Sequence, residues 1–360
     1  MKKTHPSALQ EKEGITPPEN TSFSAIDRIK KFRKQNLNPR ELAKKICNGN
    51  TIALSRAITL VESTNPEHTE KANEIITACL PKANKSIRIG ITGVPGAGKS
   101  TFIESFGLHL TSLEKKVAVL AVDPSSSISK GSILGDKTRM EDLVRDRNAF
   151  IRPSPSGDSL GGVARKTRET IILCEACGFD TIIIETVGVG QSETAVHSMV
   201  DFFLLLKLAG AGDELQGIKR GIMEMADAIV INKADGDNLK PAKKARAEFA
   251  RALHIYPPKE SGWIPKALVA SSINGSGIDD IWKLIEDYKE NTFASGYFNT
   301  KRMEQQKFWF LQTIEERLKT NFYQNKTIKA ALKEKEKALE AMEETPFKAA
   351  NELLNLYYNL

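Results

Sequence analysis

The chain has few of the residues that build disulfide scaffolds or zinc sites. Its 360 residues include only 4 cysteines and 5 histidines. A zinc site takes four ligands at suitable spacing, and the histidines form no cluster that would supply them. Cys174 and Cys177 form a C-x-x-C pair within a stretch of amphipathic helical spacing. We therefore expect reduced, buried cysteines on a helix in preference to a redox pair or a metal site.

The sequence also lacks an apolar run of about 20 residues, the length that crosses a membrane. The first residues, MKKTHPSALQEKEG, have no apolar core of a secretion signal, and they include Glu11 and Glu13, which are unusual in a transit peptide. We expect a cytoplasmic protein without a membrane partner. The net charge of +7 is spread along the chain without a nucleic-acid motif. Solvated helix faces explain it better than a nucleic-acid partner.

Composition divides the chain into four segments. Residues 1–21 are polar and rich in Pro, Glu and Lys, so we expect them to be disordered. Residues 22–85 show only helical patterns. Residues 86–292 alternate short apolar runs with helical spacing, which predicts an α/β domain with a mostly parallel sheet. Residues 293–360 are helical again, with apolar stripes that must pack on the core or on another subunit.

Short apolar runs in the α/β segment are typical of strands buried in a parallel sheet. They are IRIGIT, KVAVLAV, AFIR, DTIIIET, DFFLLLK, AIVIN and KALVAS. Ligands of such sheets bind outside the carboxyl ends of the strands. Residues that close these runs are therefore the first candidates for chemistry.

The stretch GVPGAGKS, residues 93–100, matches the phosphate-binding pattern G-x-x-x-x-G-K-[ST]. It stands between an apolar run and a helical one, which is the order that the motif requires. Backbone N–H groups of the loop can converge on phosphate oxygens, Lys99 can reach the outer phosphates, and the Ser100 hydroxyl can ligate Mg²⁺. The predicted nucleotide contacts are Gly96, Ala97, Gly98, Lys99, Ser100 and Thr101.

Carboxylates follow two of the apolar runs at the level of this loop. Asp123 follows KVAVLAV, Glu185 closes the run DTIIIE, and Asp136 lies further along the first connection. A single strand-end acid is more often a helix cap or a solvated group. Three acids beside one phosphate loop favour a Mg²⁺ site in which they join Ser100 as oxygen ligands.

The residues after Glu185, TVGVGQSE, resemble the D-x-x-G element of GTPases with Glu in place of Asp. The backbone N–H of Gly188 is a candidate sensor of the γ-phosphate. Gln191 is a candidate for orienting the attacking water, with an ordinary surface glutamine as the equal alternative. Residues 210–221 form a glycine-bracketed segment that contains Lys219. Such a charged loop either stabilises the transition state and reports the nucleotide state, or only connects two elements.

The run AIVIN leads into NKAD, which predicts recognition of guanine by Asn232, Lys233 and Asp235. An Asp carboxylate can accept hydrogen bonds from both N1–H and the N2 amino group of guanine. Adenine lacks these two donors, so the motif selects GTP over ATP. Ser271 and Ser272, in VASSINGSG, are expected to place backbone groups at the base oxygen.

Longer strings around these motifs closely resemble the methylmalonyl-CoA mutase-associated GTPases, the MeaB/ArgK group of P-loop GTPases. The strings are GVPGAGKST, VDPSSS, GDKTRM, RPSPSGDSLGGVARKTRE, ETVGVGQSE, AGAGDELQGIKRGIMEMAD and NKADGDN. The resemblance implies a GTPase chaperone that docks on an adenosylcobalamin-dependent acyl-CoA mutase, gates delivery of the cofactor and protects the mutase. It also implies a homodimer made largely through the C-terminal helices, and a role for Lys219 in the loop that communicates with the mutase.

Two functions of different classes remain open from the sequence. One is a switch whose GTP hydrolysis is accelerated by the mutase and coupled to cobalamin loading. The other is a nucleotide-binding interaction protein whose hydrolysis is incidental. Glu185, Gln191 and the charged loop favour the switch, because a pure binder does not need them. Methylmalonyl-, ethylmalonyl- and isobutyryl-CoA mutases are all candidate partners, since no motif distinguishes them.

Overall fold

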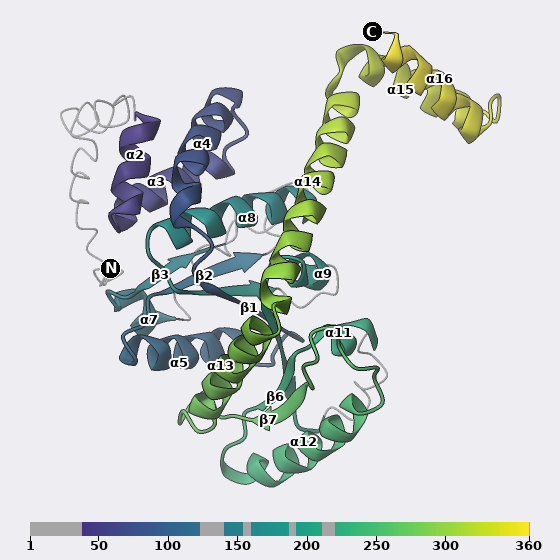
Figure 1. The fold of residues 1–360 in the computed structure, drawn as a ribbon. Helices are drawn as coiled ribbons and strands as arrows, with labels where there is room; N and C mark the ends of the chain where they lie inside the picture. Colours follow the sequence, from purple (N-terminus) through teal and green to yellow (C-terminus); the bar gives the residue numbers. More distant parts are fainter. Residues whose placement is uncertain (1–37, 123–139, 154–159, 187–191, 211–219, 360) are drawn as a thin grey trace, which may run out of the picture.

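The computed structural model describes residues 38–122, 140–153, 160–186, 192–210 and 220–359. Within these ranges, seven parallel strands form one sheet in the order β3-β2-β4-β1-β5-β6-β7 (Figure 1). The strands are β1 (Ile87–Gly93), β2 (Val117–Val122), β3 (Ala149–Arg152), β4 (Thr181–Thr186), β5 (Phe202–Leu208), β6 (Ala228–Asn232) and β7 (Lys266–Val269). The predicted α/β fold is confirmed, and each predicted apolar run matches one strand to within two residues at either end.

Helices cover both faces of the sheet and bury it. One face packs on α5 (Lys99–Ser112), α7 (Glu141–Arg145) and α13 (Ile278–Ala294), and the other packs on α8 (Leu160–Ala176) and α9 (Ser192–His197). The helices α11 (Arg220–Met225) and α12 (Leu239–Leu253) lie against β5 and β6, and α12 is preceded by the short η2 (Gly236–Asn238). Because β1 is central and covered on both sides, all of its residues are buried.

Among the described residues, three α-helices precede the sheet, within the segment 22–85 where the sequence shows only helical patterns. They are α2 (Pro39–Cys47), α3 (Thr51–Glu62) and α4 (Pro66–Cys79), and α4 continues into the short η1 (Leu80–Lys82). Each begins after an asparagine whose side chain accepts a hydrogen bond from a backbone N–H of the first turn, namely Asn38, Asn50 and Asn65. Their apolar faces pack on α8 and extend the core beyond the sheet.

The chain continues from α13 into the long helix α14 (Tyr297–Gln324), which passes across the sheet and leads away from it (Figure 1). The hairpin of α15 (Lys326–Glu340) and α16 (Pro346–Tyr358) lies at its far end. The near end of α14 is fixed by Arg302, which is buried and bonds both carboxylate oxygens of Asp201 at 2.8 and 2.7 Å. Asp201 also accepts from the backbone N–H of Arg88 at 2.8 Å, so this ion pair joins α14 to β1 and β5.

The cysteines are buried or half-buried thiols in the helical layer beside the sheet. Cys174 and Cys177 lie at the end of α8, with Cys79 and Cys47 nearby at the ends of α4 and α2. Burial raises the pKa of the Cys79 thiol to about 12 and that of Cys177 to about 11. These two thiols are therefore protonated at neutral pH, and the expectation of buried helix cysteines is confirmed. Among the described helices, none is long and apolar enough to cross a membrane.

Candidate nucleotide site

The predicted phosphate loop lies between β1 and α5, at the carboxyl edge of the sheet. At two positions of the loop, steric contacts explain why the residue is glycine. A Cβ atom on Gly93 would lie 2.6 Å from the carbonyl oxygen of Leu206 in β5. Gly98 has a φ of 83°, in the left-handed region, and a Cβ atom there would lie 2.9 Å from Nδ2 of Asn232. The loop therefore has its shape only with glycine at these positions.

Lys99 is the first residue of α5, and its side chain folds back over the loop. Its ammonium group donates hydrogen bonds to the carbonyl oxygens of Gly93 at 2.8 Å and Val94 at 3.4 Å. Burial lowers the pKa of Lys99, while the nearby carboxylates of Glu185 and Glu193 act in the opposite direction. A poorly solvated ammonium group gains more from an anionic ligand than one in open water does. The side chain thus stands where the motif requires a phosphate contact.

Ser100 and Glu185 meet beside this loop although they are far apart in the sequence. Oγ of Ser100 lies 3.5 Å from Oε1 of Glu185, which is the next-to-last residue of β4. Parallel pairing of β4 with β1, in which Glu185 stands opposite Ile91, brings the carboxylate to this level. A hydrogen bond of 2.8 Å from Thr186 to Thr92 joins the ends of the same two strands. Two oxygen groups of the kind that Mg²⁺ prefers therefore face each other.

The predicted guanine-binding residues lie on the neighbouring part of the same edge. Asn232 closes β6, and its buried side chain donates to the carbonyl oxygen of Ala97 at 2.9 Å and accepts from Oγ of Ser272 at 2.8 Å. Oγ of Ser271 donates to Oδ2 of Asp235 at 2.6 Å. The phosphate loop, the NKAD segment and the serine loop are thus held together by their own side chains.

The remaining predicted residues divide into two groups. Gly96, Thr101 and Lys233 are exposed at the surface of this edge, and Lys233 has a φ of 58°. Gly96 has space around it for a side chain but a φ of 86°. Five predicted site residues lie outside the described residues, namely Asp123, Asp136, Gly188, Gln191 and Lys219.

The sequence predicts Asn232 as a guanine contact and does not indicate its second role as a link between loops. Its side chain bonds the carbonyl oxygen of Ala97 and the hydroxyl of Ser272. Lys207, which the predicted run DFFLLLK includes, is a buried member of β5 and stands opposite Ile231 of β6. The strand continues one residue beyond it, to Leu208.

Comparisons with known proteins agree with this geometry. The family model described as "Methylmalonyl Co-A mutase-associated GTPase MeaB" matches residues 54–327. A putative GTPase of Caulobacter vibrioides is 51% identical over 306 residues, which cover 85% of this chain and 94% of the relative. GTPase ArgK of Escherichia coli K12 is 48% identical over 285 residues, which cover 79% of this chain and 86% of ArgK.

A mitochondrial relative and a solved structure extend the similarity. The methylmalonic aciduria type A homolog of Mus musculus is 45% identical over 319 residues, covering 86% of this chain and 77% of that protein. The crystal structure of a protein called LAO/AO transport system kinase is 38% identical with a TM-score of 0.72, covering 90% of this chain and 99% of that one. With its P-loop, parallel sheet and family match, the chain belongs to the methylmalonyl-CoA mutase-associated GTPase MeaB family of P-loop GTPases.

Proposed function

We propose that this GTPase is a switch that controls the entry of adenosylcobalamin into an acyl-CoA mutase and protects the loaded enzyme. Methylmalonyl-CoA mutase is the first candidate partner, because the matched family is named for its association with that enzyme. The observation that carries the proposal is the family match over residues 54–327, combined with the meeting of the phosphate loop, Glu185 and NKAD at one edge. A generic GTP-binding protein would share the second feature without the first.

The residues at the phosphate loop suit a magnesium nucleotide. Lys99 would contact the outer phosphates, and the backbone N–H groups at the start of α5 would bind phosphate oxygens. Ser100 and Glu185 would hold Mg²⁺, together with Asp123 and Asp136, which lie outside the described residues. The 3.5 Å approach of Oγ of Ser100 to the Glu185 carboxylate supports this assignment, because both are hard oxygen donors. Bound magnesium would neutralise charge on the phosphate oxygens.

Guanine recognition is proposed for Asp235, with Ser271 and Ser272 beside it. The hydrogen bond from Ser271 fixes one carboxylate oxygen of Asp235 at 2.6 Å and so orients the carboxylate. Asn232 would contact the base and also link the loops, because its amide keeps a second N–H after it donates to Ala97. A base bound at Asp235 would therefore be connected to the phosphate loop through the side chains of Ser271, Ser272 and Asn232.

The residues proposed to complete hydrolysis lie outside the described residues. Gly188 would sense the γ-phosphate, Gln191 would orient the attacking water, and Lys219 would supply charge and communicate with the mutase. The proposal is tested by the rate of GTP hydrolysis with and without an adenosylcobalamin-dependent acyl-CoA mutase. A rise in the rate supports the switch, and an unchanged rate with the mutase bound supports incidental hydrolysis.

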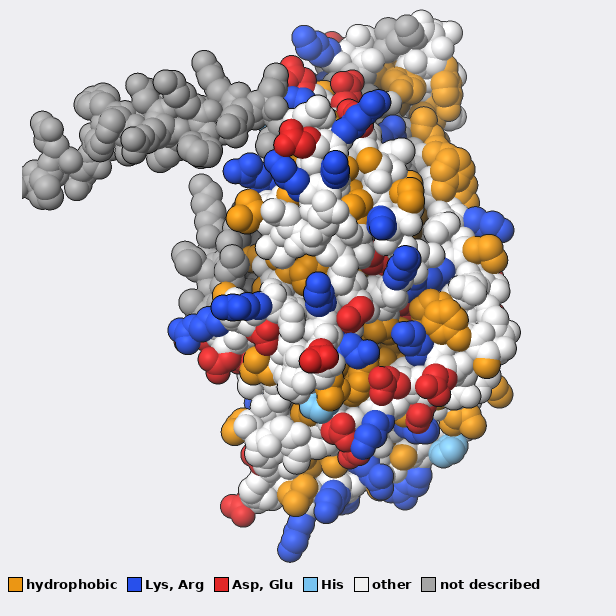
Figure 2. Space-filling model, turned by 60° about the vertical axis from the view of Figure 1, so that its left-hand side comes forward, with side chains coloured by type: hydrophobic (Ala, Val, Ile, Leu, Met, Phe, Trp, Pro, Cys, Tyr) orange, Lys and Arg blue, Asp and Glu red, His pale blue; other side chains and the backbone are white. Residues whose placement is uncertain are grey.

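We also propose a homodimer, because α14 exposes large apolar side chains along its far half. The exposed fractions are 45% for Phe308, 65% for Phe310, 57% for Leu311, 42% for Ile314 and 58% for Leu318. Hydrophobic side chains are visible along the upper right edge of the molecule (Figure 2). A stripe of this kind on a helix normally packs against a partner. Light scattering should give twice the chain mass of 39.8 kDa, and a monomer mass would contradict the proposal.

A further inference from the structure

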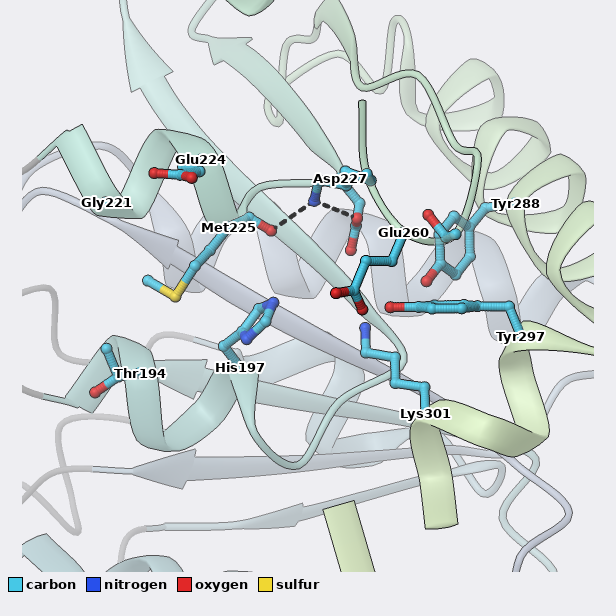
Figure 3. A pocket seen from close by; sticks show the side chains of 12 residues that line it. Thr194, His197, Gly221, Glu224, Met225, Asp227, Glu260, Tyr288, Tyr297 and Lys301 are labelled. Carbon is cyan, nitrogen blue, oxygen red and sulfur yellow. Dashed lines mark hydrogen bonds and ion pairs between the residues drawn. The ribbon is translucent and has the colours of Figure 1, made fainter. Parts of the chain in front are cut away.

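A cavity of about 480 Å³ lies at the amino ends of β5 and β6, at the opposite end of these strands from the phosphate loop. Its walls come from α9, α11, the segment after α12, and the adjoining ends of α13 and α14 (Figure 3). This volume is within the range of small-molecule sites in proteins. None of the residues predicted to bind GTP lines the cavity.

One side of the cavity is formed by the ion pair of Lys259 and Asp227, whose charged groups already have hydrogen-bond partners in the protein. Nζ of Lys259 lies 2.6 Å from Oδ1 of Asp227 and donates to the carbonyl oxygen of Met225 at 2.8 Å. The other carboxylate oxygen of Asp227 accepts from the backbone N–H of Phe203 at 2.9 Å. These contacts stabilise the starts of β5 and β6. The pair is therefore part of the wall, and it leaves recognition of a ligand to other groups.

Lys301 and Tyr297 offer hydrogen-bond donors from the first turns of α14. The ammonium group of Lys301 donates to the carbonyl oxygen of Asp201 at 2.8 Å, which uses one of its three N–H bonds. Within the described part of the chain, it forms no ion pair within 4.0 Å, and the hydroxyl of Tyr297 has no hydrogen-bond partner. Both side chains point into the cavity (Figure 3). Together they suit a carboxylate.

Glu224 and Glu260 give the cavity a negative charge as well. Glu224 projects from α11, across the cavity from Lys301, and Glu260 lies between them in the view of Figure 3. Neither carboxylate forms an ion pair with another residue that the structure describes. His197 adds no charge at neutral pH, because burial lowers its pKa to about 4. A ligand with only a carboxylate would be repelled by these acids, whereas one that also carries an ammonium group would be attracted.

We propose that this cavity binds a small zwitterion, with its carboxylate at Lys301 and Tyr297 and its ammonium group at Glu224 and Glu260. Glu224 and Glu260 are exposed to water at this cavity and form no ion pair with Lys301. A ligand that carries both charges would replace their water contacts with charged contacts at all three groups. The cavity and the phosphate loop share no residue, so binding of a zwitterion can be tested without GTP and without the mutase.

The test is calorimetric titration of the full-length, nucleotide-free protein with the common α-amino acids, β-alanine and γ-aminobutyrate, each up to about 10 mM, a concentration that detects millimolar affinity. Acetate and methylammonium serve as probes that carry one charge each. At least one zwitterion should bind, and both single-charge probes should bind at least about tenfold more weakly. If no zwitterion binds, or if a single-charge probe binds as well, the proposal is wrong.

Substitutions of Glu224, Lys301 and Tyr297 test whether these residues bind the zwitterion. Glu224→Gln and Lys301→Met should each weaken the bound zwitterion by about tenfold to a hundredfold, because each removes a charge-assisted contact, and Tyr297→Phe by several fold. Matched controls are Glu248→Gln on α12 and Lys307→Met on α14, whose side chains are exposed and do not line the cavity. Thermal unfolding checks each fold. If Lys301→Met does not fold, Glu224→Gln and Tyr297→Phe decide, and unchanged affinity in both would overturn the proposal.

Discussion

Replacing Lys99 with alanine is expected to lower GTP hydrolysis by at least about a hundredfold and to weaken GTP binding. Removing one preorganised charge or donor from a developing anion typically costs about 10² to 10³ in rate. Lys99 also bonds the carbonyl oxygens of Gly93 and Val94, so its loss loosens the loop itself. Steady-state phosphate release and titration with a fluorescent GTP analogue measure the two effects.

The matched control for this variant is Lys82→Ala. Lys82 is an exposed lysine at the end of η1, in the connection that precedes β1. This control should hydrolyse GTP at the wild-type rate, since it removes the same charge from a place without a nucleotide contact. Hydrolysis in Lys99→Ala within about threefold of the wild-type rate would show that Lys99 is not a phosphate contact, because even one neutral hydrogen bond is worth about that much.

Replacing Asp235 with asparagine is expected to weaken GTP binding by about two to four decades and to create affinity for xanthosine triphosphate. Two charge-assisted hydrogen bonds, at about 1.5 to 3 kcal/mol each, account for that loss. Xanthine has an oxygen where guanine has its amino group. An asparagine amide can therefore donate to that oxygen and still accept from N1–H, so the hydrogen-bond pattern is restored for the changed base.

The control is Asp237→Asn, in η2 two residues further along, whose side chain is exposed. It should leave the GTP affinity unchanged and give no binding of xanthosine triphosphate. In Asp235→Asn, the hydroxyl of Ser271 can donate to the new amide oxygen as it does to the carboxylate, so the local fold should be kept. Weakened GTP binding without a gain for the xanthine nucleotide would show a lost contact but no exchange of base specificity. Undiminished affinity for GTP would remove Asp235 from the guanine site.

The strands and the phosphate loop could be predicted because their signals are local. Each strand is a short apolar run, because a strand that is buried on both faces has nearly all of its side chains in the apolar core. Two glycines of the loop stand where the backbone requires them. Gly98 has a left-handed backbone conformation, and Gly93 lies too close to β5 for a side chain. The helix starts at Asn38, Asn50 and Asn65 carry equally local capping signals.

Contacts between distant segments could not be predicted in this way. The bond from Asn232 to Ala97 depends on how β6 and β1 are placed in the sheet, and no spacing in the sequence encodes it. The same is true of the Arg302 and Asp201 ion pair, whose partners are about a hundred residues apart. The cavity near Lys301 is assembled from five elements. Its residues Gly221, Glu224, Met225 and Asp227 lie in the string AGAGDELQGIKRGIMEMAD, but nothing in that string indicates that it meets α9, α13 and α14.

The burial of Lys207 is a feature of β5 that the sequence pattern does not explain. The predicted run DFFLLLK ends at Lys207, whereas β5 continues to Leu208 and Lys207 is almost fully buried at 1% exposure. Burying a lysine is costly unless its charge is compensated. Lys207 has an interaction partner in the folded protein, and a partner brought close by folding cannot be predicted from the neighbouring sequence.

The central claim is that a mutase partner controls hydrolysis, and the most direct test is steady-state GTP hydrolysis with and without an adenosylcobalamin-dependent acyl-CoA mutase. Lys99→Ala and Lys82→Ala are measured in parallel, and binding of the mutase is confirmed by its elution together with the GTPase. We predict that the mutase raises the rate by at least about tenfold, since partner stimulation of GTPases reaches about 10³ to 10⁵, and that Lys99→Ala stays inactive. A rate that does not change while the mutase is bound would contradict the switch.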